Sequence, residues 1–187
     1  MNILPITQYG DKILRKKTHK VEEVDAGTIE LIKNMFDTMK NSNGIGLAAN
    51  QVGSDKAIFV ADISGIEGNE KVKPLVAINP SIIERSEETS IYEEGCLSIP
   101  NIKVEIERPK VVVMKYQDAN LKGHTIEADN IFARVLQHEY DHTQGILFVD
   151  YFTVSQKKKY RNQLNKIRKR EIDIEYPVSE NLEYVLR

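Results

Sequence analysis

The feature that most constrains the fold is a series of short strand-like runs joined by turns. Between residues 57 and 118 these runs read AIFVADI, PLVAINP, KVEIE and KVVVMKYQD. Turn-forming segments such as SGIEGNE, RP and DANLKG lie between or after them. Parallel strands need a crossover connection, usually a helix, and none of these strand pairs leaves room for one. The sequence therefore predicts antiparallel sheets.

Three segments outside those runs have helical periodicity. Residues 28–41, TIELIKNMFDTMKN, place their large apolar side chains on one face of a helix, which the glycines of the following segment end. A second helix is predicted to begin at Asp129, a suitable N-cap, and to stop at Gly145. A third helix, from Val154 to Arg170, has a thin apolar stripe. Antiparallel sheets around a central metal-binding helix, with a C-terminal helix, describe an α+β fold.

Length and composition favour a single domain. A chain of 187 residues with 41% hydrophobic residues can bury one sizeable core. Within this domain, residues 1–153 are predicted to form the catalytic part, and residues 154–187 a basic C-terminal helix and tail. The net charge of −2 gives no reason to expect DNA as a partner. The sequence has no apolar run of about 18 residues and no signal-peptide core, so no membrane attachment and a cytoplasmic location are expected.

The segment QHEYDH, residues 137–142, carries the strongest chemical signal. His138 and His142 lie four residues apart, so both imidazoles occupy one helix face and can converge on one ion. Apolar residues one and two turns earlier share that face, which indicates that it points into the protein. Glu139 is rotated by about 100° and lies beside the ion, where it can handle protons. A chance pair is the alternative, but the chain has only four histidines.

A third ligand is required, because catalytic divalent metals usually take three protein ligands and leave one position for water. Cys96 is the only thiol and lies in the segment YEEGCLSIP. A lone cysteine in a reducing compartment is commonly a buried small hydrophobe, and the sequence does not exclude that role. A thiolate with two neutral imidazoles would leave a divalent ion with a net positive charge, which lowers the pKa of bound water to roughly 7. Cys96 is therefore the best third ligand.

Three segments, taken in order, resemble the signature motifs of the peptide deformylase family. They are GIGLAANQ from Gly44 to Gln51, EGCLS from Glu94 to Ser98, and QHEYDH. The opening LPITQYGDKILRKK is also similar to that family's N-terminus, so the likeness covers most of residues 3–152. The resemblance is closer to the first bacterial type of the family than to the second. It implies a hydrolase that removes the formyl group from the N-formylmethionine of new polypeptides and releases formate.

The resemblance also implies roles for single residues. The metal ligands would be Cys96, His138 and His142. The metal would be Fe2+, with Zn2+, Ni2+ or Co2+ able to substitute. Glu139 would act as general base and then as general acid, while Gln51 and the backbone N–H of Leu97 would stabilise the oxyanion.

The same resemblance places further residues along the cleft that takes the N-formylmethionyl peptide. The positions that would line it are Ile45, Gly46, Tyr92, Ile131, Arg134 and Val135. Arg108 matches an arginine that the family places near the substrate backbone. Glu94, which is close to the cysteine, is counted with the cleft residues as a group that can orient the site.

The tail is strongly basic, since eight of the fourteen residues from Lys157 to Arg170 are lysine or arginine. Such a run is usually a solvated helix face. The family resemblance raises an alternative, which is docking to ribosomal RNA beside emerging chains. Electrostatic docking of that kind weakens steeply with salt.

Two other functions use part of the same motif. A zincin-type endopeptidase takes its third ligand after the H-E-x-x-H helix. No histidine follows that helix, but four glutamates do, namely Glu171, Glu175, Glu180 and Glu183. A non-catalytic structural metal module would need four protein ligands, and a fourth is hard to find among so few cysteines and histidines.

Overall fold

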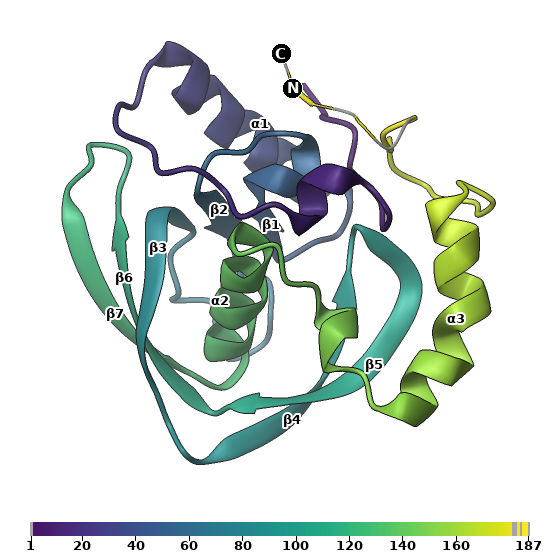
Figure 1. Cartoon of the computed structure of the whole chain (residues 1–187). Helices are drawn as coiled ribbons and strands as arrows, with labels where there is room; N and C mark the ends of the chain where they lie inside the picture. The colour runs from purple at the N-terminus through teal and green to yellow at the C-terminus, as the bar shows by residue number, and fades with distance from the viewer. Residues whose placement is uncertain (1, 181–182, 184, 187) are drawn as a thin grey trace.

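Seven β-strands and three α-helices make up the part of the chain that the computed structural model describes, which is residues 2–180, 183, 185 and 186 (Figure 1). The α-helices are α1 (Ala26–Asn41), α2 (Asn130–Thr143) and α3 (Val154–Arg168). The strands are β1 (Gly46–Ala48), β2 (Ile58–Ala61), β3 (Leu75–Arg85), β4 (Thr89–Cys96), β5 (Ile99–Pro109), β6 (Val111–Gln117) and β7 (Gly123–Asp129). The short 3-10 helices are η1 (Lys12–Arg15), η2 (Ala49–Val52) and η3 (Phe148–Tyr151). Within these residues, no helix combines the length and the apolar character needed to cross a bilayer.

The strands form two antiparallel sheets. Five of them lie in the order β1-β2-β3-β6-β7, and β4 and β5 form a separate two-stranded sheet. Each neighbouring pair in both sheets is antiparallel. Figure 1 shows α2 in the middle of the fold, between the two sheets. The predicted α+β fold, with antiparallel sheets around a central helix, is confirmed.

The sequence does not predict three of the strands, β1, β4 and β7. In β4, TSIYEEGC, and in β7, GHTIEAD, only one residue of each strand is fully buried. Apolar runs reveal strands that bury at least one face, and these two strands have too few apolar side chains to be recognised. With three residues, β1 is too short for any periodicity. Strand β4 therefore occupies what the sequence presents as a long connection before β5.

Helix α2 begins and ends close to the predicted positions. Asp129 is its N-cap, although its side chain makes no capping hydrogen bond, and Thr143 is its last residue. Gly145 follows with φ of +74°, and a Cβ at this position would lie 2.6 Å from the carbonyl oxygen of Arg15. Only glycine fits both the left-handed conformation and the close approach. The prediction that this glycine marks the end of the helix is confirmed within two residues.

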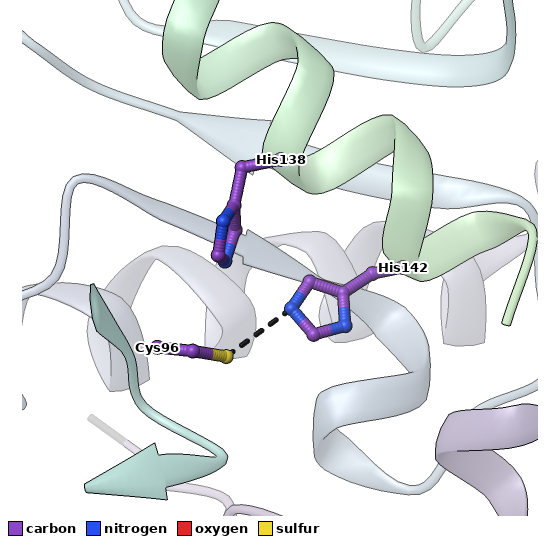
Figure 2. A group of neighbouring side chains, drawn as sticks. All are labelled: Cys96, His138 and His142. Carbon is purple, nitrogen blue, oxygen red and sulfur yellow. Dashed lines mark hydrogen bonds between the residues drawn. The ribbon is translucent and has the colours of Figure 1, made fainter. Parts of the chain in front are cut away.

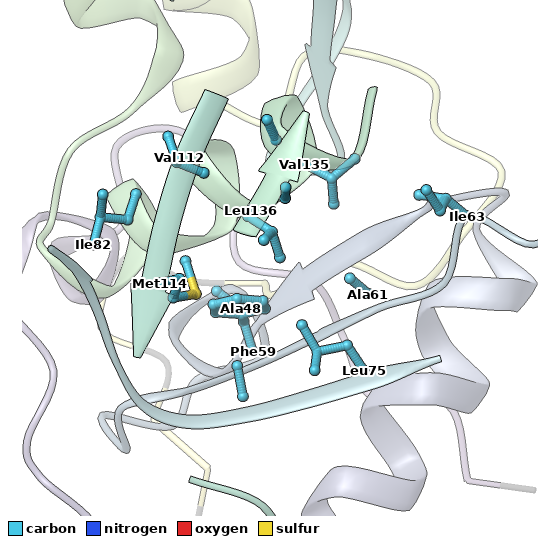
Figure 3. Packing of buried hydrophobic residues seen from close by; sticks show 13 residues of the cluster. Ala48, Phe59, Ala61, Ile63, Leu75, Ile82, Val112, Met114, Val135 and Leu136 are labelled. Carbon is cyan, nitrogen blue, oxygen red and sulfur yellow. The ribbon is translucent and has the colours of Figure 1, made fainter. Parts of the chain in front are cut away.

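The apolar side of α2 packs against the inner face of the five-stranded sheet. Val135 and Leu136 lie in one buried cluster with Phe59 and Met114 (Figure 3). Full burial of an apolar side chain of this size stabilises the fold by about 1.5–3 kcal/mol. This packing fixes the rotation of α2 about its axis, and therefore the direction in which its two histidines point.

Helix α3 lies against β5 and η3. Its residue Ile167 is fully buried in a cluster with Ile99, Phe148 and Phe152. The helix ends at Arg168, two residues before the predicted end. The chain then reverses and returns to the N-terminal segment.

Candidate metal centre

The three predicted metal ligands come together at the centre of the fold. His138 and His142 are one turn apart on α2, and Cys96 is the last residue of β4 (Figure 2). One ligand atom from each residue lies within 4.8 Å of the other two. The Cys96 sulfur is 3.2 Å from Nε2 of His142. Among the described residues, this is the one group of three or more such side chains close enough to hold a metal ion.

A local irregularity between β4 and β5 brings the thiol to this position. Gly95 pairs with Lys103, but Cys96 pairs with Ile99, so the register shifts between two consecutive residues. Such shifts bend a strand and re-aim a side chain. The sulfur thereby reaches the helix from a strand that is distant in sequence, which is why the spacing of the residues does not reveal the site.

Glu94 holds one of the histidines in place. Its carboxylate is buried and accepts a hydrogen bond from Nδ1 of His138 at 3.0 Å. Arg108 donates to it through Nε at 2.7 Å and Nη2 at 3.1 Å, and Arg134 through Nη1 at 2.8 Å. Because Nδ1 is engaged in this way, Nε2 of His138 is left to face a metal. Burial alone would raise the pKa of Glu94, but His138 and Arg108 outweigh it and hold that pKa well below its usual range.

Arg108 is not where the sequence analysis expected it. Its guanidinium is buried behind the ligands, where Nη1 donates to Asp141 at 2.6 Å and the group stacks 4.4 Å from the ring centre of Tyr151. Strand β5 alternates between buried and exposed residues, and Arg108 falls on the buried side with Val104 and Ile106. It does not line the cavity at the metal centre. The arginine therefore supports Glu94 and Asp141 from within the fold.

The two candidate ligand histidines, His138 and His142, differ electrostatically. Burial lowers the pKa of His142 well below its usual value, so this ring is neutral, as a ligand must be. Burial also opposes charge on His138, but Cys96 and Glu94 outweigh it and raise that pKa well above its usual value. Metal binding would displace the proton of His138.

Glu139 is the fourth polar group of the centre. Its side chain is buried, and Oε2 has no hydrogen-bond partner among the described residues. Burial raises the pKa of this carboxyl to about 7. A Cβ on Gly46 would lie only 2.3 Å from Oε1, so glycine is needed there for the carboxyl to fit. A thiol, two imidazoles and an unpartnered carboxylate oxygen fit a divalent transition metal with a water beside it.

A cavity of about 480 Å³ opens beside these groups. Besides the two ligands Cys96 and His138, and Glu139, its lining includes the predicted residues Ile45, Gly46, Gln51, Glu94, Leu97, Ile131, Arg134 and Val135. Tyr92, which was also expected there, does not line it, and its ring packs instead 5.1 Å from the Arg134 guanidinium carbon. Lys103 and Tyr176 also line the cavity, although no pattern in the sequence indicated them. Neither lies in a motif that would have revealed it.

Gln51 is held with its amide nitrogen toward the thiol. Its Oε1 accepts from the backbone N–H of Ala48 at 2.8 Å, which fixes the orientation of the amide. Its Nε2 lies 3.2 Å from Ser98 Oγ and 3.4 Å from Cys96 Sγ. The amide nitrogen, which lies in the cavity lining, is therefore directed at the Cys96 sulfur and the Ser98 hydroxyl.

We expect Glu94→Gln to weaken both the fold and the metal site. The change leaves two buried arginines without their shared anion, and removal of one partner of a buried ion pair typically costs about 3–5 kcal/mol. Loss of the carboxylate behind a ligand histidine typically costs about 10–100-fold in metal affinity. Urea unfolding and competition with a chelator measure the two effects. The matched control is Glu105→Gln, at an exposed residue of the neighbouring strand β5 that does not line the cavity, and equal effects from the two changes would contradict the assignment.

Comparison with known proteins agrees with this geometry. A model of the polypeptide deformylase family matches residues 3–159. A peptide deformylase of Chlorobium phaeobacteroides is 44% identical over 177 residues, which is 95% of each chain. The crystal structure of a peptide deformylase from Plasmodium falciparum has a TM-score of 0.81 and 38% identity, covering 88% of this chain and 95% of that one. The enzyme from Thermotoga maritima gives a TM-score of 0.76 and 40% identity, covering 82% and 99%.

Neither alternative function, a zincin-type endopeptidase or a structural metal module, fits this centre. A zincin would take its third ligand after α2, but the group that can hold a metal contains none of the four C-terminal glutamates. A structural module would need a fourth ligand, and the group has three. The family model covers most of the sequence, and the motifs that it covers meet at one centre. The chain therefore belongs to the polypeptide deformylase family.

Proposed function

We propose that this enzyme carries out deformylation with Cys96, His138 and His142 as the ligands of Fe2+, and that Zn2+, Ni2+ or Co2+ can substitute. The chain is a metal-dependent hydrolase that removes the formyl group from the N-terminal formylmethionine of newly synthesised polypeptides and releases formate. The observation that supports the assignment of residues is the meeting of one thiol and two imidazoles beside a buried carboxylate. A bound divalent cation supplies a Lewis acid that polarises a carbonyl and lowers the pKa of water.

Glu139 is proposed to move the proton of the reaction. Its carboxylate takes a proton from the water that attacks the formyl carbon and passes it to the departing amine. Burial raises the pKa of this carboxyl to about 7 in the metal-free protein, and a divalent cation nearby would favour its ionised form, which accepts the proton of the water. The buried oxygen Oε2 has no partner among the described residues with which such a water would compete.

Gln51 and Leu97 are proposed to stabilise the negative charge that develops on the formyl oxygen. The amide of Gln51 is fixed by Ala48, and its nitrogen contacts the Cys96 sulfur at the edge of the cavity. Leu97 lies in the turn between β4 and β5 and lines the cavity, and its backbone N–H is the second donor. Loss of one such donor typically costs about 3 kcal/mol in the transition state.

The cavity is proposed to take the methionine side chain and the first backbone units of the substrate. Apolar residues of its lining that suit a methionine are Ile45, Ile131 and Val135. Strand β1, which carries Gly46, is the edge strand of the larger sheet, so a peptide backbone can pair with it. A formyl group carries only hydrogen on its carbonyl carbon, so a narrow site admits it and rejects bulkier acyl groups.

Formate release from formyl-Met-Ala-Ser by anaerobically prepared protein, with metal analysis of the same sample, tests the proposal. We expect one iron per chain and rapid formate release. Acetyl-Met-Ala-Ser is the control and should not be hydrolysed. A metal-loaded protein that releases no formate, or that hydrolyses both peptides equally, would refute the proposed function.

The basic helix α3 is proposed to dock on ribosomal RNA in the cytoplasm, where new chains emerge. Seven basic side chains on α3 or directly after it are exposed, namely Lys157, Lys158, Lys159, Arg161, Lys166, Arg168 and Lys169.

We also propose that residues 154–187 belong to the same domain as residues 1–153, because Ile167 is buried against Ile99 and Phe148.

We expect replacement of Lys157, Lys158, Lys159 and Arg161 by glutamate to abolish co-sedimentation with ribosomes. Phosphate contacts depend on positive charge, and the binding of the wild-type protein should fall steeply with added salt. Hydrolysis of a short formylated peptide should change by less than about twofold, because these side chains lie outside the cavity.

The matched control for this experiment removes the same number of positive charges elsewhere. Exposed lysines suited to it are Lys33, Lys71, Lys115 and Lys122. Their replacement by glutamate should leave co-sedimentation intact. An equal loss of binding in both variants would indicate a general charge effect and would rule out docking through α3.

A further inference from the structure

The segment after α3 returns to the active site. Arg170 adopts φ of +61°, and its guanidinium donates to the buried carboxylate of Asp11 and, through Nε, to the Ser179 carbonyl at 2.9 Å. The backbone N–H of Ile6 donates to the carbonyl of Pro177 at 2.9 Å, and that of Ser179 donates to the Ile6 carbonyl at 2.9 Å. The tail is therefore fixed on both sides of residue 176 by buried polar groups and by the N-terminal segment.

Tyr176 is the residue of this tail that reaches the cavity. It lines the cavity with the metal ligands Cys96 and His138. Its hydroxyl donates to the carbonyl oxygen of Leu97 at 2.7 Å, and the amide of Gln8 donates to the same oxygen at 3.3 Å. Burial raises the pKa of this phenol above its usual value, so the hydroxyl remains a donor at neutral pH.

We propose that Tyr176 is a positioning residue for deformylation. Its hydroxyl fixes the Leu97–Ser98 peptide group and thereby the position of the Leu97 Cα, to which the next peptide group, the Cys96–Leu97 peptide with the Leu97 N–H, is joined. The inference rests on the proposed role of that N–H as a donor to the oxyanion. Residue 176 lies beyond residues 3–159, the part of the chain that the family model matches. The proposed role of Tyr176 therefore depends on a residue outside the segment that the family model matches.

The position of the carbonyl explains why one hydrogen bond matters. Leu97 belongs to a two-residue turn between β4 and β5, and a turn peptide has no strand neighbours on both sides to fix its plane. The flanking Ser98 carbonyl is held by the backbone N–H of Tyr9 at 2.8 Å, so the turn is supported from behind by the N-terminal segment and by Tyr176. Without the phenol, only the longer bond from Gln8 would remain on the Leu97 carbonyl.

The expected effect is smaller than that of losing the donor itself. Removal of an oxyanion donor lowers kcat by about 10²–10³-fold, so a donor that is present but less well oriented should cost about 10-fold. The effect should fall on kcat, because the oxyanion exists only after the substrate has bound. KM should stay within about twofold, since Tyr176→Phe retains the ring that forms the cavity wall.

The test compares Tyr176→Phe with wild type on formyl-Met-Ala-Ser, with Tyr116→Phe as the control. Tyr116 is a partly buried tyrosine on β6 that stacks on His124 and does not line the cavity. We expect about a 10-fold lower kcat for Tyr176→Phe alone. Its melting temperature should fall by no more than about 4 °C, the effect of one lost hydrogen bond, and the thiolate-to-metal absorption of its cobalt form should match that of wild type.

The following outcomes would contradict the proposed role of Tyr176. A kcat equal to wild type would overturn the inference, as would a rise in KM alone. A loss of kcat accompanied by a fall in melting temperature well beyond about 4 °C, or by an altered cobalt spectrum, would also overturn it. These last results would make Tyr176 a binding or structural residue. A wild-type enzyme that releases no formate would instead refute the proposed function, and the inference with it.

Discussion

We expect Glu139→Gln to lower kcat/KM for formyl-Met-Ala-Ser by about 10²–10⁴-fold while the protein retains its metal ion, because the amide cannot accept the proton of the attacking water. Glutamine has nearly the same shape, and the cavity wall at Gly46 already fits a side chain of this size. The ligand atoms belong to other residues, so metal content should not change. Formate release and metal analysis of the same sample measure both quantities.

The control is Glu127→Gln on β7, where the side chain is exposed and should not affect catalysis. If Glu139→Gln kept more than about a tenth of the wild-type rate, a different group would have to be the base. If it lost its metal, the carboxylate would be a ligand and the proposed division of roles would be wrong.

The same variant should change how stability depends on pH when the metal is removed. The folded-state pKa of Glu139 is about 7, above its usual 4.5. For a raised pKa, the contribution to stability is fully present below 4.5 and is lost as the pH rises through 7. Glutamine cannot ionise, so relative to wild type the variant should gain up to about 3 kcal/mol between pH 5 and pH 8. Urea unfolding with a chelator at both pH values measures this gain, and a constant difference would contradict it.

The helices and the candidate metal ligands are predictable from the sequence for different reasons. Helix α2 is amphipathic, and its histidines share a face with buried residues, so periodicity alone indicated that they point inward. Cys96 was predicted to be the third ligand because the chain has no other cysteine. What placed it 3.2 Å from His142 is the shift in pairing between β4 and β5, which no local pattern encodes.

The residues that support the centre could not be predicted in the same way. Glu94, Arg108 and Arg134 come from β4, β5 and α2, and they form one buried group only because the two-stranded sheet packs against the helix. Arg108 belongs to a strand whose alternation identifies it as inward-facing, so its burial was accessible from the sequence, but its partners were not. Tyr176 depends on a chain reversal at Arg170, where a non-glycine residue adopts a left-handed conformation that sequence does not indicate.

We expect Cys96→Ala to lose metal binding and, with it, about 10³-fold or more of the activity. The change removes the only anionic ligand of the three, so affinity should fall further than the 10–100-fold typical for loss of a supporting residue. The activity should follow, because both the polarised carbonyl and the acidified water depend on the metal. Chelator competition measures the affinity, and the cobalt form should lose its thiolate-to-metal absorption.

The control for this change is His124→Asn, which removes a histidine that pairs with Asp118 at 2.7 Å, outside the candidate centre. It should bind metal like wild type, whereas Cys96→Ala should not. A hydrolase that held its metal through His138, His142 and a carboxylate would behave differently, because Cys96→Ala would then retain the ion at wild-type affinity. That result would show that Cys96 is not a metal ligand. The 3.4 Å contact between the amide nitrogen of Gln51 and the Cys96 sulfur would then no longer be evidence that Gln51 lies beside the reacting groups.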